Sequence, residues 1–175
     1  LTQSPAVVID ADGLNAIAAQ PALYFPLLQA RRRAGLAPAV LTPHPGEFGR
    51  LAPDLDWHNR QQAAQTLAQR LDAIVLLKGA STVIAAPDGR LWINPTGNAG
   101  LAKGGSGDVL CGLIAGLLAQ NLPAFEAAAA GAYLHGLAAD LAADLESGGT
   151  GRRALLPGDV LRAIGRAFAA AGWED

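Results

Sequence analysis

Short runs of consecutive apolar residues alternate along this chain with longer segments whose apolar residues recur once per helical turn. The runs at 6–9, 39–41 and 73–77 are rich in Val, Ile and Leu, which is typical of parallel strands buried on both faces. Between the last two runs, residues 59–71 place apolar side chains four positions apart, as on one face of a helix. This alternation predicts an α/β fold with a mostly parallel sheet flanked by helices.

The remaining segments complete this pattern. Pro87, Asp88 and Gly89 form a turn signal between two short apolar runs, which predicts an antiparallel hairpin at 82–94. Pro21 and Pro26 are expected to break the early helical pattern into short pieces. The other predicted helices cover residues 14–19, 24–34, 109–118, 123–145 and 159–171.

Composition limits the classes of protein that remain. The chain has 175 residues, 51% of them hydrophobic and 16% charged, which suits one globular domain with a substantial core. A net charge of −2 argues against nucleic acid as a main partner, and the apolar stretches are too interrupted for a membrane span. The basic run at 31–33 is expected to be a solvated helix end. Cys111 is the only cysteine, so we expect a reduced, cytoplasmic protein with this thiol packed on a helix.

Polar side chains follow each of the three buried runs. Because the carboxyl ends of parallel strands meet at one edge of a sheet, where ligands of such folds bind, we expect these side chains to gather there. They are Asp10, Asp12, His44, Glu47, Lys78 and Thr82.

A glycine-rich segment at 98–108 leads directly into an apolar helical run. Free backbone N–H groups and the positive end of a helix dipole make such a junction an anion site, most often for phosphate. Asp108 is unexpected there because its carboxylate would repel a phosphate. It either caps the helix, or faces a substrate hydroxyl and removes its proton while the loop holds the phosphoryl group. The glycines are Gly100, Gly104, Gly105 and Gly107.

Four segments taken together resemble the ADP/ATP-dependent NAD(P)H-hydrate dehydratases of the ribokinase-like superfamily. They are residues 10–15 (DADGLN), 41–47 (LTPHPGE), 78–82 (KGAST) and 98–120. The resemblance implies a ribokinase-like three-layer sandwich whose N-terminal part is missing here. Residues 1–175 are then expected to be a single domain, the C-terminal portion of a larger dehydratase domain. A sheet edge left open in this way favours pairing with another chain, so we expect a homo-oligomer.

The resemblance also implies an activity. Members of this family use ADP or ATP to drive the dehydration of hydrated NADH or NADPH, through phosphorylation of the ring hydroxyl and loss of phosphate. The expected partners are therefore the hydrated nicotinamide nucleotide, an adenine nucleotide and Mg²⁺. The sequence does not decide between ADP and ATP, or between the NADH and NADPH hydrates.

Roles for individual residues follow from matching the family's motifs. Asp108 matches the general base that contacts the hydrate, and His44 matches a substrate-binding position. Glu47 matches an acidic residue near Mg²⁺ that acts through water. Each has a simpler alternative, since His44 can serve as a turn residue and Glu47 can stabilise a helix start. The nucleotide-binding positions implied by the match are Lys78, Gly79, Ala80, Ser81, Thr82 and Gly107. The backbone N–H groups of Gly105, Ser106 and Gly107 are expected to hold the transferring phosphoryl group.

Five other polar residues have less defined roles. Asp10, Asp12 and Asn15 either line the pocket or form local turns. His58 and His135 have no partners at ligand spacing, so both are interpreted as structural, and nothing in the sequence resembles a zinc site.

Two other functions remain open. The first is a ribokinase-like kinase of a small alcohol such as a vitamin precursor or a sugar, which shares the chemistry up to phosphoryl transfer. The second is a nucleotide-binding fragment without turnover. A stable phosphorylated product would favour the kinase, and nucleotide binding without any product would favour the fragment.

Overall fold

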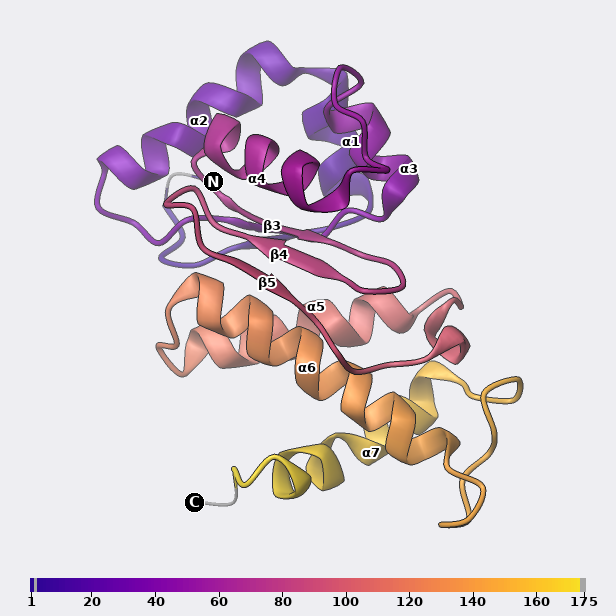
Figure 1. Cartoon of the computed structure of the whole chain (residues 1–175). Helices are drawn as coiled ribbons and strands as arrows, with labels where there is room; N and C mark the ends of the chain where they lie inside the picture. Colours follow the sequence, from indigo (N-terminus) through magenta and orange to yellow (C-terminus); the bar gives the residue numbers. More distant parts are fainter. Residues whose placement is uncertain (2, 174–175) are drawn as a thin grey trace.

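A single sheet of five strands forms the middle of the molecule (Figure 1). The computed structural model describes residue 1 and residues 3–173. The first three strands pair in parallel, and the fourth is antiparallel to both of its neighbours, so the fifth runs in the same direction as the first three. The mostly parallel sheet and the hairpin are therefore confirmed. In spatial and chain order the strands are β1 (Val8–Ile9), β2 (Val40–Leu41), β3 (Ile74–Leu77), β4 (Val83–Ala85) and β5 (Leu91–Ile93).

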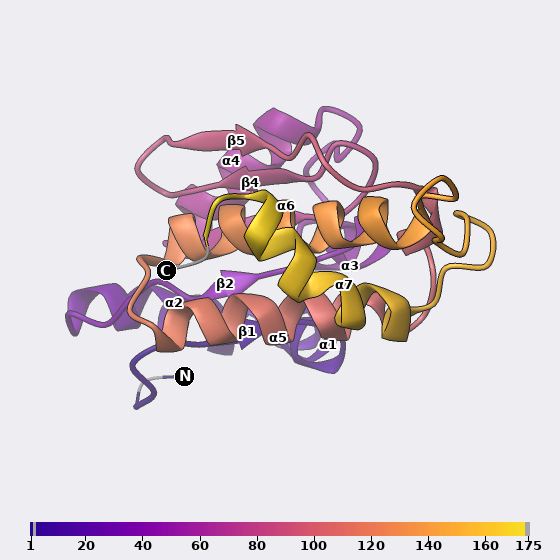
Figure 2. The same cartoon turned by 90° about the horizontal axis from the view of Figure 1, so that it is seen from below.

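Helices cover both faces of this sheet, which gives three layers (Figure 1). One face carries α1 (Asp12–Ala19), α2 (Pro21–Arg33), α3 (Pro45–Leu51) and α4 (Arg60–Leu71). The other carries α5 (Ser106–Ala119) and α6 (Ala124–Ala143), with α7 (Pro157–Ala170) packed on their outer side (Figure 2). A short 3-10 turn, η1 (Ala99–Leu101), lies between β5 and α5.

The strand β3 explains why its sequence reads as one continuous apolar run. Ile74 and Leu76 join the cluster formed with α5, α6 and α7, whereas Val75 and Leu77 join the cluster on the opposite face. All four side chains are at most 1% exposed. Successive side chains of a strand point to opposite faces, and here both faces are core.

The helix α2 departs from the sequence prediction. It runs without interruption through Pro26, so the expected break is wrong. Pro21 occupies the first turn, where a missing N–H costs nothing, and Pro26 removes only one helical bond. Burial of Leu28 in the apolar cluster between the sheet and α1–α4, together with the burial of Arg31, holds the rest of the helix in place.

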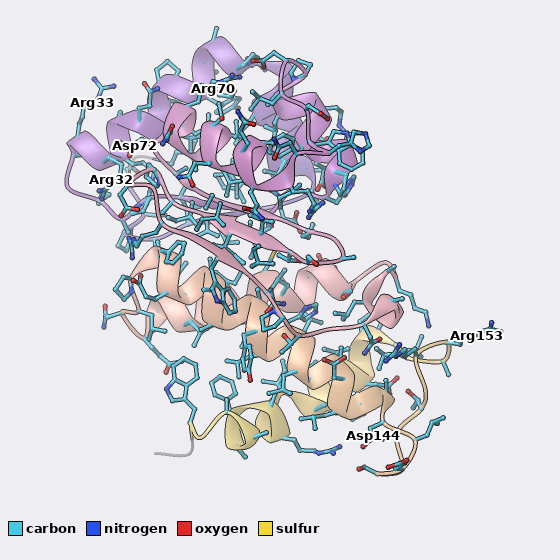
Figure 3. The ribbon with its side chains drawn as sticks, in the orientation of Figure 1. Arg32, Arg33, Arg70, Asp72, Asp144 and Arg153 are labelled. Atoms are coloured by element: carbon cyan, nitrogen blue, oxygen red, sulfur yellow. The ribbon has the colours of Figure 1, made fainter. Side chains whose placement is uncertain are left out.

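Arg31 also differs from the expectation of a solvated basic run. Its side chain is fully buried, and its guanidinium donates hydrogen bonds to the carbonyls of Leu1, Ser4, Pro5 and Ala37. A buried guanidinium is tolerated because its donors are satisfied by these carbonyls. Arg32 behaves as expected, with an exposed ion pair to Asp72 that lies near the start of β3 (Figure 3).

The seven-residue helix α3 is not among the predicted helices, but the alternative that Glu47 stabilises a helix start is confirmed. Its signal is present all the same, since His44 caps the helix, Pro45 opens it and Glu47 completes a capping box. Within the described part of the chain, no helix is both long and apolar enough to cross a bilayer.

Candidate active site

Three charged side chains meet at the carboxyl edge of the sheet. Lys78 Nζ, just past β3, lies 2.8 Å from Asp10 Oδ1 at the end of β1 and 3.8 Å from Glu47 Oε2 in α3. All three side chains are largely shielded from water. The predicted gathering of polar residues is therefore confirmed for these three. Asp12 is exposed in the first turn of α1, and no hydrogen bond or ion pair connects it to this cluster within the described residues.

The ion pair sets the charge state of Asp10. Burial alone raises the pKa of this carboxyl, but the hydrogen bond and charge of Lys78 outweigh it and hold the pKa below its ordinary value. The N–H of Ala11 and the thiol of Cys111 act in the same direction as Lys78. The cluster therefore presents one ammonium between two carboxylates, and a bound phosphate would compete with Asp10 for Lys78.

The glycine-rich segment reaches this same cluster. A Cβ added to Gly107 would lie 3.2 Å from Asp10 Oδ2 and 3.4 Å from Lys78 Nζ, so the α5 backbone passes directly beside the ion pair. α5 packs against β1, which brings its first turn to the carboxyl edge. Two segments separated by nearly thirty residues in the sequence, both predicted to bind the nucleotide, are thus brought together.

The start of α5 exposes backbone donors, although not all of those predicted. Gly105 is the N-cap with a φ of 88°, and the first helical bond runs from the N–H of Val109 to the carbonyl of Gly105. Within the part of the chain that the structure describes, the N–H groups of Gly107 and Asp108 therefore have no backbone acceptor. Ser106 differs from the prediction, because its N–H donates to the carbonyl of Lys103 at 3.2 Å and its side chain is buried.

Asp108 lies in the first turn of α5 and its side chain is exposed. It is not the N-cap, since Gly105 holds that position, and no side-chain capping bond is made at this helix. Among the described residues its carboxylate has no hydrogen-bond or ion-pair partner. The capping alternative for Asp108 is thus wrong, and its carboxylate is exposed to solvent in the first turn of α5.

The loop at 78–82 follows β3 and is held by its own hydrogen bonds. The hydroxyl of Thr82 donates to the carbonyl of Gly79 at 3.0 Å and accepts from the Gly79 N–H at 3.3 Å. Arg60 in α4 donates to the carbonyls of Leu77 and Lys78 at 2.7 and 3.1 Å, so it fixes the end of β3. Gly79, Ala80 and Ser81 are exposed above this support.

His44 and Glu47 form a reciprocal cap at the start of α3. His44 Nδ1 accepts from the N–H groups of Gly46 and Glu47, and Glu47 Oε2 accepts from the His44 N–H at 2.8 Å. An accepting Nδ1 places the hydrogen of a neutral ring on Nε2. That edge of the ring is half exposed, 3.6 Å from Glu47 Oε1. The turn role of His44 is thus confirmed, and its ring remains half exposed.

His135 is structural, as expected, but the sequence did not predict its contact with the glycine-rich segment. His135 in α6 is 7% exposed, and its Nε2 lies 3.3 Å from Ser106 Oγ. Burial lowers the pKa of His135 to about 4, so the ring is neutral at pH 7.

His135 is expected to make the stability of the folded chain depend on pH. The unfolded chain takes up the proton near pH 6.5, whereas the folded chain does so only near pH 4, so the stability present above pH 6.5 is lost as the pH falls through this window. The expected loss from this residue is about 3 kcal/mol. Denaturant unfolding of wild type and His135→Gln at pH 7 and pH 4.5 measures it. The same loss in both proteins would contradict the assignment.

Cys111 is expected to be an unreactive thiol. Burial is the main cause that raises its pKa to about 11, with the Asp10 carboxylate 3.4 Å away acting in the same direction. Only about one thiolate in a thousand is then present at pH 8. Iodoacetamide should therefore label the folded chain about 100-fold more slowly than the same chain in denaturant. Equal labelling rates would show that the thiol is accessible and its pKa ordinary.

Comparison with known proteins decides the family. The sequence profile of a family described as NAD(P)H-hydrate dehydratase matches residues 1–157 of this chain. The chain belongs to the NAD(P)H-hydrate dehydratase family.

Relatives of known description agree with this family. The chain is 49% identical over 163 residues to the bifunctional NAD(P)H-hydrate repair enzyme Nnr of Moorella thermoacetica, covering 91% of this chain and 28% of that protein. It is 45% identical to the ADP-dependent (S)-NAD(P)H-hydrate dehydratase of Neisseria meningitidis, covering 77% of this chain and 45% of the relative. The chain therefore spans less than half the length of these curated relatives.

Solved structures support the same fold. The ADP/ATP-dependent NAD(P)H-hydrate dehydratase of Bacillus subtilis, co-crystallised with ATP/Mg²⁺, superposes with a TM-score of 0.73 at 32% identity, covering 94% of this chain and 55% of that chain. A ribokinase-like superfamily protein of Enterococcus faecalis superposes at 0.65 with 26% identity, covering 97% of this chain and 54% of that one. The expected ribokinase-like sandwich is therefore confirmed.

The carboxylates of this dehydratase-family site are suited to bind Mg²⁺ through water and not directly. Both oxygens of Glu47 already face protein donors, and Asp10 is paired with Lys78. Across residue 1 and residues 3–173, no three His, Cys, Asp or Glu side chains are grouped as metal ligands. This set suits an ion that keeps several waters and is bound mainly by nucleotide phosphates, with Glu47 contacting its water shell.

Proposed function

We propose that this site dehydrates hydrated NADH or NADPH at the expense of ADP or ATP. The observation that carries the proposal is the unpartnered carboxylate of Asp108 beside the open N–H groups of α5, with Lys78 close to Gly107. A phosphoryl cradle with a free base at its rim is what transfer to a hydroxyl requires. Membership of the dehydratase family supports the hydrated nicotinamide ring as the acceptor.

The proposed reaction has two steps. The ring hydroxyl oxygen attacks the terminal phosphorus of the nucleotide while Asp108 takes the hydroxyl proton. The bond from that phosphorus to the nucleotide breaks, and the ring carries a phosphoester. The C–O bond of the ring then breaks, phosphate leaves, and loss of a proton from the adjacent carbon restores the double bond. Phosphorylation is needed because hydroxide is a poor leaving group and phosphate a good one.

Each residue of the site has a part in this scheme. The N–H groups of Gly107 and Asp108 hold the transferring phosphoryl oxygens, and Lys78 offsets their charge. The 79–82 loop contacts the nucleotide, and the exposed edge of His44 contacts the hydrate. Bound Mg²⁺ would neutralise phosphate charge, with Glu47 oriented toward its water shell. Ser106 supports the cradle from beneath and is no longer proposed as a direct donor.

We also propose that residues 1–175 are the C-terminal portion of a longer dehydratase domain. The support is that the chain covers 45% of the Neisseria dehydratase and 55% of the Bacillus chain. β1 lies at an edge of the described sheet, so further strands from the same domain or another subunit could pair there. On this proposal the 175 residues alone bind nucleotide but regenerate NADPH weakly or not at all. The natural protein that contains them is active.

The test combines chemically hydrated NADPH, Mg²⁺ and the natural protein that contains this chain, with ADP and ATP in parallel reactions. Return of the reduced nicotinamide absorbance only when a nucleotide is present is the expected result, and the faster nucleotide is the donor. Accumulation of a stable phosphorylated alcohol without NADPH would favour the kinase instead. Nucleotide binding without any product would favour a binding module.

A further inference from the structure

The helix α6 contacts both ends of the segment that joins β5 to α5, and it also contacts η1. At the start of this segment, Asp140 accepts hydrogen bonds from the N–H of Gly97 at 2.7 Å and from the side-chain amide of Asn98 at 2.8 Å. Asn98 in turn accepts from the N–H of Gly100 at 2.9 Å. One carboxylate of α6 therefore fixes the backbone where the glycine-rich segment begins.

The backbones of the segment and of α6 are in direct contact. A Cβ added to Gly136 would lie 2.3 Å from Thr96 Oγ1, which leaves no room for any side chain. Gly97 has a φ of 102°, and a Cβ there would lie 3.3 Å from the Gly136 Cα. The hydroxyl of Thr96 donates to the carbonyl of Tyr133 in α6 at 2.8 Å. The two glycines let the segment rest on the helix, and the polar contacts fix its position.

The end of the segment is held by the same helix. Ser106, the first residue of α5, contacts Nε2 of His135 at 3.3 Å, and both side chains are buried. Between the two anchors, Gly104 is in open space, since a Cβ there would meet nothing within 4 Å, whereas Gly100 is packed against Arg152 and Leu155. A stretch of this composition loses much conformational entropy when a ligand orders it. Anchors at both ends remove part of that cost before binding.

We propose that Asp140 and His135 are positioning residues that hold the glycine-rich segment in its phosphoryl-binding conformation. The inference rests on the proposed function, because it holds that α6 keeps the nucleotide-binding loop ordered. Neither residue touches the phosphoryl group. Their effect is on the affinity for nucleotide, and a saturating nucleotide orders the loop without them.

Binding of ADP and of ATP with Mg²⁺ to this chain, followed by calorimetry, tests the proposal. Asp140→Ala, Asp140→Asn and His135→Ala should each raise the Kd by about tenfold or more. His135→Gln should recover most of the affinity, because its amide nitrogen can occupy the place of Nε2. Amide hydrogen exchange should quicken over 97–107 in the weakened variants and stay unchanged in β3.

Leu134→Ala is the matched control, since Leu134 is buried in α6 in the core shared with α5 and α7. It should lower the Tm as much as the test variants without changing the Kd at a temperature where all are folded. In the natural protein, Asp140→Asn should raise the KM for nucleotide and leave kcat within about threefold, because saturation orders the loop.

Two outcomes overturn the proposal and they can be told apart. If wild type binds nucleotide and the folded Asp140 and His135 variants bind equally well with unchanged exchange over 97–107, the two residues do not position the loop. If wild type binds neither ADP nor ATP, the proposed function itself fails, and the role assigned to α6 fails with it.

Discussion

Replacing Asp108 by Asn is expected to lower the turnover of hydrated NADPH by about 10²–10⁴ while leaving nucleotide affinity nearly unchanged. The change removes the exposed carboxylate that is proposed to take the hydroxyl proton. It keeps the shape and the exposure of the side chain, so folding should be unaffected. Nucleotide affinity should hold or rise slightly, because a carboxylate close to a phosphate is lost. Steady-state assays of the natural protein, with calorimetric Kd values, measure both effects.

Glu126→Gln provides the matched control for this prediction. Glu126 is also an exposed acid in the first turn of a helix, α6, where it pairs with Arg90. Removing its charge has the same effect on a helix dipole as removing that of Asp108, and it should leave turnover unchanged. Wild-type turnover in Asp108→Asn would remove this residue from the mechanism. A loss seen mainly in nucleotide Kd would give it a binding role.

Gly107→Val is expected to produce the largest loss of nucleotide affinity. Its Cβ would enter the 3.2–3.4 Å contacts with Asp10 and Lys78, and its methyl groups would cover the open N–H groups of the first turn. Such overpacking costs about 1–3 kcal/mol, which corresponds to roughly a 5- to 150-fold weaker Kd. Displacement of the Lys78 ammonium would weaken binding further. Calorimetric titration of the folded variant with ADP and with ATP gives the result.

Gly112→Val controls for the introduction of a β-branched residue into the same helix. A Cβ on Gly112 would meet nothing within 4 Å, so this variant carries the same helix-propensity change without the collision. It should bind nucleotide like wild type. If Gly107→Val also binds ADP and ATP with wild-type affinity, the start of α5 does not bind the phosphates, and the proposed phosphate site is wrong.

Local patterns predicted most of the fold. The runs at β1, β2 and β3 are read correctly because strands buried on both faces need continuous apolar sequence. The glycine-rich junction at α5 is predicted correctly because its glycines and the helix that follows are adjacent in the sequence. Pro26 was misleading, because α2 runs through it without a break. A proline favours a break or a helix start depending on contacts made elsewhere in the chain.

The unpredicted parts of the site depend on distant contacts. His135 and Ser106 are 29 residues apart, and Asp140 and Asn98 are 42 apart, so no spacing in the sequence links them. Ser106 was expected to donate to phosphate because the sequence could not tell which donors of the loop point inward. The expectation for Asp108 came from chemistry, since a carboxylate in an anion site needs another role, and from the match to the family's general base. Its exposed, unpartnered position fits that expectation.

The most direct test of the account follows the oxygen of the ring hydroxyl. NADPH hydrate carrying ¹⁸O in that hydroxyl is turned over in unlabelled water by the natural protein with nucleotide and Mg²⁺. Mass spectrometry then measures the label in the inorganic phosphate that is released. The account predicts that the label appears in phosphate in proportion to the NADPH formed, because the hydroxyl oxygen leaves as part of the phosphate. Unlabelled phosphate with normal NADPH formation would show that the ring hydroxyl is never phosphorylated, and would contradict the account.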